Sequence, residues 1–337
     1  MKKYIFLTII TSLCFTLAAE TKLTAMKGKV SDGYNFWFYE PDFKTTPVVE
    51  QDTTKVLSLP TDSLSSEELI ALEMGNNTVD LDSIQQDVVQ QDNVKKDSIS
   101  NLKPLVIFLH GRSLCGNDLN KVLRYGTIDA VKGGRVIDAY IIAPQNPGTF
   151  WNPDKIMNIV DWVTERYAVD TNRIYVLGMS LGGYGTIDLT AAYPERIAAA
   201  MALCGGGSRK DLSGLNQVPL WIIHGTADKA VSVNESRKVK NKMEEAGETP
   251  LLRYDEWAGV NHGALARLFY MNKTYEWLFK HTLDNRVVDT SISITQEDTK
   301  SAYKGFKHRS SSKGKSAKNK KKSSKKKSKK SSKKKSK

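Results

Sequence analysis

The segment Gly178-Met179-Ser180-Leu181-Gly182 has the residue types and spacing of a nucleophilic serine turn. An apolar run at 174–179 precedes Ser180 and a helix-like segment at 181–193 follows it, so the serine lies where a buried strand meets a helix. The chain must turn sharply there, and glycine at both flanks removes Cβ atoms that would collide. We therefore predict Ser180 as a nucleophile; the alternative is a glycine-rich turn without chemistry.

A serine hydroxyl needs a base to take its proton, and the chain offers five histidines. His262 lies in a loop between the last predicted strand and the last predicted helix, where it could reach across the sheet edge, so it is the predicted base. His110 and His224 end strands and are each followed by glycine, which favours a role in holding loops. His281, at the end of the last helix, is expected to be exposed, and His308 lies in a basic tail.

A base of this kind needs a carboxylate that fixes its tautomer and stabilises its charged form. Asp228 follows the predicted strand 220–223 and therefore lies at the carboxyl end of a strand. Asp255 is the alternative, but it precedes His262 too closely to come from a separate strand. We predict Asp228 as the acid that orients His262.

The tetrahedral intermediate of acyl transfer carries an oxyanion that two backbone N–H groups can bind. The amide of Leu181, directly after the serine, is one predicted donor, and the amide of Arg112, after strand 105–109, is the other. The Arg112 side chain is then free to point elsewhere and does not predict an anionic substrate. No His, Cys and Asp cluster has metal-ligand spacing along the chain, so we expect neither a metal nor another cofactor.

The region from 103 to 283 alternates apolar strands with amphipathic helices, which predicts a mostly parallel central sheet covered by helices on both faces, an α/β fold. Residues 20–40 are expected to add an N-terminal hairpin around a turn at 31–33. The predicted strands end at or near residues 109, 143, 179, 203, 223 and 254, and the predicted helices include 156–167, 181–193, 233–246 and 265–280.

The flanking segments are expected to have other roles. Residues 1–19 have two lysines, an apolar run and small residues before Glu20, which is typical of a cleaved signal peptide and predicts export to the periplasm or the medium. Lipid attachment at Cys14 is an alternative, although Leu13 stands where a small residue is usual. Export would allow a disulfide between Cys115 and Cys204, but the favoured interpretation is two separate buried thiols.

Charge is unevenly distributed along the chain. Residues 300–337 carry 19 Lys and Arg and no Asp or Glu, so the preceding 299 residues hold 31 basic against 37 acidic side chains. Residues 41–102 form an acidic, low-complexity insert with a five-residue repeat that fits neither a helix nor a strand, and we expect it to be disordered. The Lys/Ser-rich tail, 284–337, is also expected to be disordered and to bind an anionic envelope polymer, or else to act only as a solubilising tail.

Several motifs together resemble the α/β-hydrolase superfamily, and most closely its carboxylesterase/phospholipase-like and feruloyl-esterase or polyester-depolymerase-like branches. These motifs are Leu109-His110-Gly111-Arg112, Ala143-Pro144-Gln145, Gly178-Met179-Ser180-Leu181-Gly182, His224-Gly225-Thr226-Ala227-Asp228 and Asn261-His262-Gly263. The resemblance implies an α/β-hydrolase fold over 103–283 and the order Ser, Asp, His. Similar enzymes carry an aromatic residue at this place, near the acyl pocket. Trp151 is therefore expected either to line the substrate pocket or to pack in the core.

The sequence thus predicts an exported serine hydrolase that cleaves small or polymer-linked carboxylic esters. A serine peptidase of the same fold is one alternative, because the same three groups cleave amides. An inactive scaffold that binds envelope polymers through the tail is another.

Overall fold

The computed structural model describes residues 22–42 and 102–304. The predicted signal peptide, nearly all of the acidic insert and the basic tail beyond Lys304 lie outside the described residues.

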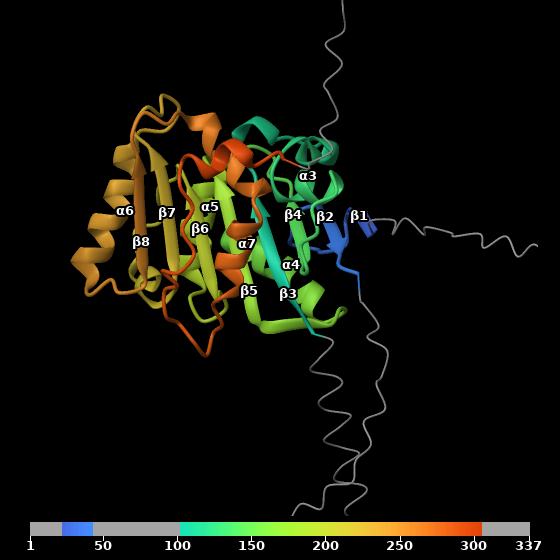
Figure 1. Ribbon diagram of the computed structural model, residues 1–337. Helices are drawn as coiled ribbons and strands as arrows, with labels where there is room; N and C mark the ends of the chain where they lie inside the picture. The colour runs from blue at the N-terminus through green and yellow to red at the C-terminus, as the bar shows by residue number, and fades with distance from the viewer. Residues whose placement is uncertain (1–21, 43–101, 305–337) are drawn as a thin grey trace, which may run out of the picture.

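The described chain forms a single eight-stranded sheet in the order β1-β2-β4-β3-β5-β6-β7-β8 (Figure 1). β1 and β2 are antiparallel to their neighbours. The other six strands, β4, β3, β5, β6, β7 and β8 in sheet order, are parallel to one another. The strands are β1 (Lys22–Met26), β2 (Phe36–Glu40), β3 (Lys103–Leu109), β4 (Tyr140–Pro144), β5 (Val169–Met179), β6 (Ala199–Leu203), β7 (Leu220–Gly225) and β8 (Leu252–Trp257).

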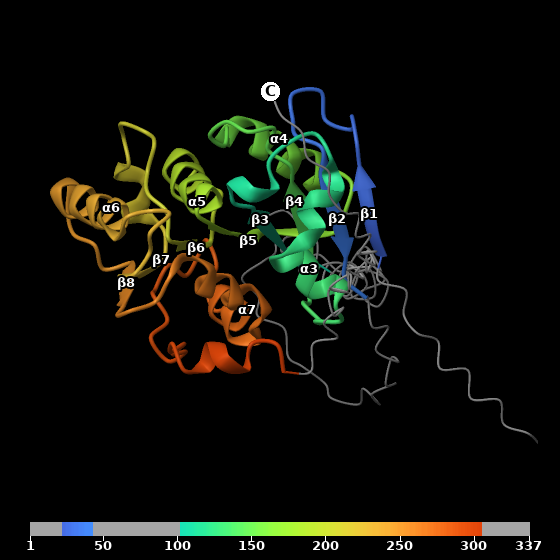
Figure 2. The ribbon, with the colours of Figure 1, turned by 90° about the horizontal axis from the view of Figure 1, so that it is seen from above.

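Helices cover both faces of this sheet, as the view from above shows (Figure 2). Along β3, Leu105, Ile107 and Leu109 face one core, which α4, α5 and α6 complete. Val106 and Phe108 face the other core, which is shared with α3, η5 and α7. The helices are α3 (Thr127–Lys132), α4 (Pro153–Thr164), α5 (Leu181–Ala192), α6 (Val233–Ala246) and α7 (Asn272–Phe279), with 3₁₀ turns η2 (Arg112–Leu114), η3 (Leu119–Arg124), η4 (Ser213–Gln217), η5 (His262–Tyr270) and η6 (Asp298–Ser301).

The sequence-based fold is confirmed, and the N-terminal hairpin forms with Met26 opposite Phe36. The single helix predicted at 265–280 is wrong, because the chain forms η5 and α7 with Met271 in an extended conformation between them. Side chains of α7 donate hydrogen bonds to backbone carbonyls near the end of η5, where the helix is interrupted. The Thr274 hydroxyl donates to the Leu268 carbonyl at 2.7 Å, and the Tyr275 hydroxyl donates to the Phe269 carbonyl at 2.6 Å.

The predicted C-terminal boundary at residue 283 is also wrong, because residues 284–304 pack against the body. Ile294 and Ala302 are buried in the same core as Leu265 of η5. The Arg286 guanidinium donates to the Pro194 carbonyl at 2.7 Å and to the Gln217 carbonyl. We call residues 284–304 the C-terminal strap. Its sequence is mostly polar with isolated apolar residues, so it carries no periodic signal.

The strap also explains why His281 is fully buried rather than exposed as expected. The His281 ring lies 4.6 Å from the Trp277 ring, measured between centroids, and its Nε2 accepts a hydrogen bond from the Asp289 amide at 3.1 Å. Burial lowers the pKa of His281. Because Asp289 belongs to the strap, the sequence of α7 alone could not reveal this environment.

The strand directions place the two ends of the 43–101 interval at one edge of the sheet. β2 runs antiparallel to β4, with Tyr39 opposite Ile141, so Glu40 lies at the amino ends of the parallel strands. β3 begins there as well, at Lys103. The residues with candidate chemistry follow the carboxyl ends of the strands, at the opposite edge. Within residues 22–42 and 102–304, no helix has the length and apolar character needed to cross a bilayer.

The strap leads to a prediction about stability. A chain that ends after Lys304 should unfold at the same temperature as the full-length chain, whereas a chain that ends after Leu283 should unfold at a lower one. The shorter chain loses the buried side chains of Ile294 and Ala302 and the hydrogen bonds of Arg286. Circular dichroism melting measures the difference.

A point variant gives the matched control for this prediction. Ile294→Ala, at a buried position, should reduce the free energy of unfolding by about 2–5 kcal/mol. Val287→Ala, in the same strap but 68% exposed, should change it by less than about 0.5 kcal/mol. Equal stability of the Ile294→Ala and Val287→Ala proteins would contradict the packing described for the strap.

Candidate active site

Ser180 lies in the sharp turn that the sequence predicts, between β5 and α5. Its φ of 60° and ψ of −121° are in the positive-φ region that L-residues rarely adopt. The flanking glycines permit this turn, because a Cβ on Gly182 would lie 1.9 Å from the Leu109 carbonyl oxygen. A Cβ on Gly178 would lie 2.3 Å from the Gly182 carbonyl oxygen. The backbone therefore fixes Ser180 at the carboxyl edge of the sheet.

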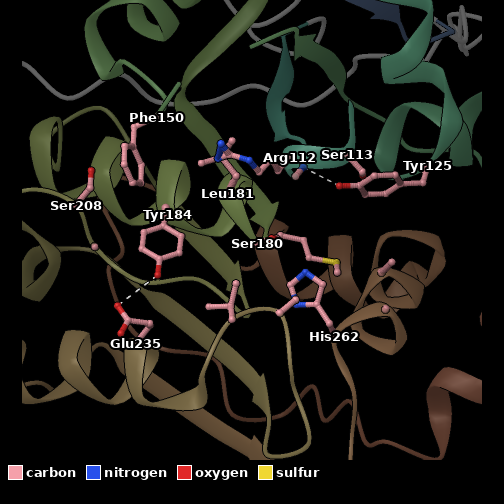
Figure 3. Close-up of a pocket in the computed structure, with 17 residues that line it drawn as sticks. Arg112, Ser113, Tyr125, Phe150, Ser180, Leu181, Tyr184, Ser208, Glu235 and His262 are labelled. Carbon is pink, nitrogen blue, oxygen red and sulfur yellow. Dashed lines mark hydrogen bonds between the residues drawn. The ribbon is translucent and has the colours of Figure 1, made fainter. Parts of the chain in front are cut away.

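The two predicted oxyanion donors both lie at helix starts beside Ser180. Leu181 is the first residue of α5, and Arg112 is the first residue of η2. The first amides of a helix have no partner inside the helix, so they can bind an acceptor from outside. Leu181, Arg112 and Ser180 line the same pocket (Figure 3).

Buried side chains hold the loop that carries Arg112. His110 is fully buried; its Nε2 accepts from the Asn146 amide at 3.1 Å, so Nδ1 carries the proton and donates to the Gly111 carbonyl at 2.8 Å. Burial lowers the pKa of His110 to about 4. The Gly111 amide donates to the Tyr125 hydroxyl at 2.7 Å. The predicted loop-holding role of His110 agrees with these contacts.

The structure brings His262 and Asp228 together, although 34 residues separate them. Nδ1 of His262 lies 2.6 Å from Oδ2 of Asp228, whose side chain is fully buried. The other oxygen, Oδ1, accepts from the amides of Ala230 at 2.8 Å and Val231 at 2.9 Å. Burial alone would raise the pKa of Asp228, but the hydrogen bonds from Val231, His262 and Ala230 outweigh it and hold the pKa below its usual value.

An ionised carboxylate only accepts hydrogen bonds, so the proton of a neutral His262 ring is on Nδ1 and Nε2 keeps its lone pair. Asp255, the alternative acid, does not contact His262. Its Oδ2 accepts from the Trp221 indole at 2.6 Å and from Arg253 at 3.3 Å. Among the sequence candidates, Asp228 therefore has the geometry that an orienting acid requires.

His224 is buried behind this pair, as a loop-holding residue. Its Nδ1 lies 2.7 Å from the Ser236 hydroxyl, and its Nε2 lies 3.1 Å from the Val231 carbonyl. Burial lowers the pKa of His224. Since Val231 also holds Asp228 through its amide, His224 secures the loop that positions the carboxylate.

Ser180 and His262 face a pocket of about 810 Å³ (Figure 3). Asp228 does not line it and lies behind His262. Ser113, Tyr125, Phe150, Tyr184, Ser208 and Glu235 are among the other lining residues.

Trp151 does not line this pocket, so the prediction that it is a pocket residue is wrong and the alternative, packing in the core, is what the structure has. Its side chain is 3% exposed and packs on α5, where a Cβ on Gly185 would lie 2.5 Å from the indole. The Trp151 ring also lies 5.3 Å from the Tyr34 ring and 5.0 Å from the His110 ring, measured between centroids. The preceding residue, Phe150, is 57% exposed and lines the pocket instead.

Sequence reasoning missed the wall formed by Tyr184 and Glu235. The Tyr184 hydroxyl donates to Glu235 Oε2 at 3.3 Å, and the Tyr184 ring lies 6.0 Å from the Phe150 ring. Burial and the neighbouring Glu235 raise the pKa of Tyr184 to about 12. Tyr184 could have been found, because it lies four residues, about one helical turn, after Ser180. Glu235, on α6, had no sequence signal.

Cys204 is a further residue that sequence reasoning did not place in the site. It follows β6, is fully buried and has a φ of 38°. Its Sγ and ligand atoms of Asp228 and His262 all lie within 4.8 Å of one another. The fold thus assembles a Cys, Asp and His group that spacing along the chain does not reveal. Cys115 and Cys204 are both free thiols, so the possible disulfide does not form.

Residues 152–274, which contain Ser180, Asp228 and His262, match the Dienelactone hydrolase family. Among curated proteins, the chain is 33% identical over 97 residues to a probable acetylxylan esterase A of Neosartorya fischeri, covering 24% of this chain and 26% of that protein. It is 36% identical over 70 residues to an acetylxylan esterase A of Aspergillus awamori, covering 21% of this chain and 23% of that protein. The chain thus spans about a quarter of the length of these relatives.

Among solved structures, a thermostable esterase is 28% identical, with a TM-score of 0.44 and coverage of 54% of this chain and 55% of that chain. The eight-stranded sheet order, the serine turn after β5 and the family match over 152–274 lead to one conclusion. The described part of the chain has the α/β-hydrolase fold.

Proposed function

We propose that this protein is a serine hydrolase that cleaves carboxylic esters through an acyl-enzyme. Ser180 is the nucleophile, His262 the base, and Asp228 the acid that orients the base. The observation that carries the proposal is the 2.6 Å hydrogen bond between His262 Nδ1 and Asp228 Oδ2. It leaves the Nε2 lone pair of a pocket-lining imidazole available for the Ser180 proton.

In the proposed reaction, the Ser180 hydroxyl attacks the ester carbonyl while His262 Nε2 takes its proton. The amides of Leu181 and Arg112 bind the oxyanion, and the protonated imidazole is stabilised by the Asp228 carboxylate. His262 then gives the proton to the departing alcohol. A water molecule, activated by the same imidazole, hydrolyses the acyl-enzyme and restores Ser180.

Esters are favoured over peptides because the curated relatives reported above are named as esterases, over the quarter of their length that aligns. The pocket is also large enough for a small ester or for an ester at the edge of a polymer. A serine peptidase and an inactive polymer-binding scaffold remain the alternatives. A panel of p-nitrophenyl esters of increasing acyl length, acetylated xylan and peptide substrates separates these three functions.

The first test of this mechanism is removal of the nucleophile. Ser180→Ala should lower ester turnover by about 10⁴- to 10⁶-fold, because the substitution removes the hydroxyl that forms the acyl-enzyme. Labelling by a fluorophosphonate probe should disappear, while the circular dichroism spectrum stays unchanged. Ser208→Ala is the control, because Ser208 lines the same pocket and its hydroxyl donates to Asp188. A labelled Ser180→Ala protein would exclude Ser180 as the nucleophile.

The second test concerns the acid. In Asp228→Asn, the amide oxygen can still accept from the Ala230 and Val231 amides, so the NH₂ group faces His262. The neutral imidazole then carries its proton on Nε2, where it cannot accept the proton of Ser180. The value of kcat should therefore fall by roughly 10⁴-fold. Asp255→Asn, which touches Trp221 and Arg253, should have only a mild effect. The reverse order of the two kcat values would move the orienting role to Asp255.

We further propose that the protein is exported and that residues 305–337 bind an anionic envelope polymer. The basis is the signal-like pattern of residues 1–19 and the 19 basic residues without an acidic one after residue 299. Deleting 305–337 should leave turnover of soluble esters unchanged but remove salt-sensitive retention on a heparin resin. Sequencing the N-terminus of protein recovered from the periplasm or medium should give Glu20. Equal retention of both proteins, or an intact N-terminus, would refute the corresponding part.

A further inference from the structure

The thiol of Cys204 is a buried nucleophilic group that the proposed acyl transfer does not use. It comes from the end of β6, whereas Asp228 lies in the loop after β7 and His262 begins η5. The three side chains bring one sulfur, one carboxylate oxygen and one imidazole nitrogen within 4.8 Å of one another. Three separate parts of the fold thus bring a sulfur, an oxygen and a nitrogen donor close together.

Cysteine sulfur, imidazole nitrogen and carboxylate oxygen are the donors that proteins use for Zn²⁺, at about 2.0–2.3 Å from the metal. Thiolate binding favours soft and borderline cations, whereas Mg²⁺ and Ca²⁺ prefer sites made of oxygen ligands. Asp228 and His262 alone could attract many cations weakly. Cys204 adds a donor that selects thiophilic ones.

We propose that Cys204, Asp228 and His262 form an inhibitory site for a thiophilic divalent cation, such as Zn²⁺ or Cd²⁺. The site itself depends only on these three side chains. Its effect on turnover rests on the proposed function, in which His262 is the base.

The cation replaces the proton on Cys204, which leaves to solvent, and it takes the place of the proton on His262 Nδ1. That second proton moves to Nε2, so the imidazole stays neutral. A thiolate and a carboxylate then balance the two positive charges, and no oxidant or reductant takes part. Because Nε2 now carries a proton, it cannot accept one from Ser180, and acyl transfer stops.

The protein must open slightly to admit the cation. The 2.6 Å hydrogen bond between His262 and Asp228 has to be replaced by two metal bonds, which moves these atoms apart. His262 is the residue that can move, because its side chain is 25% exposed and lines the pocket, whereas the side chain of Asp228 is fully buried. The pocket side of His262 is therefore the entry route.

The experiment measures inhibition and binding separately, on the full-length protein. Zn²⁺ and Cd²⁺ should inhibit ester turnover, while Mg²⁺ and Ca²⁺ at the same concentration should not. Loss even of an outer-shell partner weakens a metal site about 10- to 100-fold, so Cys204→Ser should raise the half-inhibitory concentration at least about tenfold. Each variant is compared with its own uninhibited rate. Cys115→Ser, at the other free thiol, is the matched control and should leave the half-inhibitory concentration unchanged.

Binding is followed by the ultraviolet charge-transfer absorption of a Cd²⁺–thiolate bond, which needs no turnover. The absorption should appear in the original and Cys115→Ser proteins and be absent from Cys204→Ser. If Cys204→Ser does not fold, Cys204→Ala and the Cys115→Ser protein supply the same comparison. Absence of the absorption in the original protein, or equal inhibition with and without Cys204, would overturn the proposal. Absorption without detectable turnover on any substrate would instead reject the proposed function and leave the metal site standing.

Discussion

The start of α5 touches the end of β3 backbone to backbone, and the candidate site depends on this contact. A Cβ on Gly182 would lie only 1.9 Å from the Leu109 carbonyl oxygen, so no side chain can stand between the helix and the strand. The close approach forces Ser180 into its positive-φ conformation, which costs of order 1–3 kcal/mol that the packing around it must offset. It also brings the first amide of α5 beside the loop after β3, from which Arg112 comes. The proposed nucleophile and the proposed oxyanion donors are therefore positioned by one steric constraint.

Neutral buried polar groups hold the loops around this contact. A neutral imidazole can donate from one nitrogen and accept at the other, so His110 links an amide of one loop to a carbonyl of another. Burial lowers the pKa of both His110 and His224, which disfavours their charged forms. A second positive ring near His262 would oppose the charge that His262 gains in the proposed reaction. Burial therefore keeps His110 and His224 from becoming a second positive charge beside His262.

The sequence was most informative for candidate site residues that directly follow a strand. Ser180, Asp228 and Asn261-His262 each follow a strand, and the carboxyl ends of parallel strands meet at one edge, so chain order was enough to group them. Their roles in catalysis remain a proposal. The sequence could not decide whether Phe150 or Trp151 lines the pocket. The space above Gly185 decides which of the two rings turns into the core, and that space exists only in the folded molecule.

Other features gave no local signal at all. Glu235 of α6 reaches the pocket through its contact with Tyr184 of α5, and Cys204 meets Asp228 because β6 and β7 are neighbours in the sheet. The C-terminal strap has too few apolar residues for a periodic pattern, yet Ile294 and Ala302 complete a core. Contacts of this kind arise from tertiary packing, which propensity and periodicity along a single chain do not encode.

The placement of Glu40 and Lys103 at the amino edge of the sheet has a consequence for how this protein can vary in length. Both ends of the intervening segment are anchored by strand pairing, on the side of the sheet away from Ser180. The entropy of closing a flexible loop grows only slowly, by about 0.6 kcal/mol for each doubling of its length. Any flexible connection between these two anchors could therefore differ in length at small energetic cost, while the edge that carries Ser180 keeps its shape.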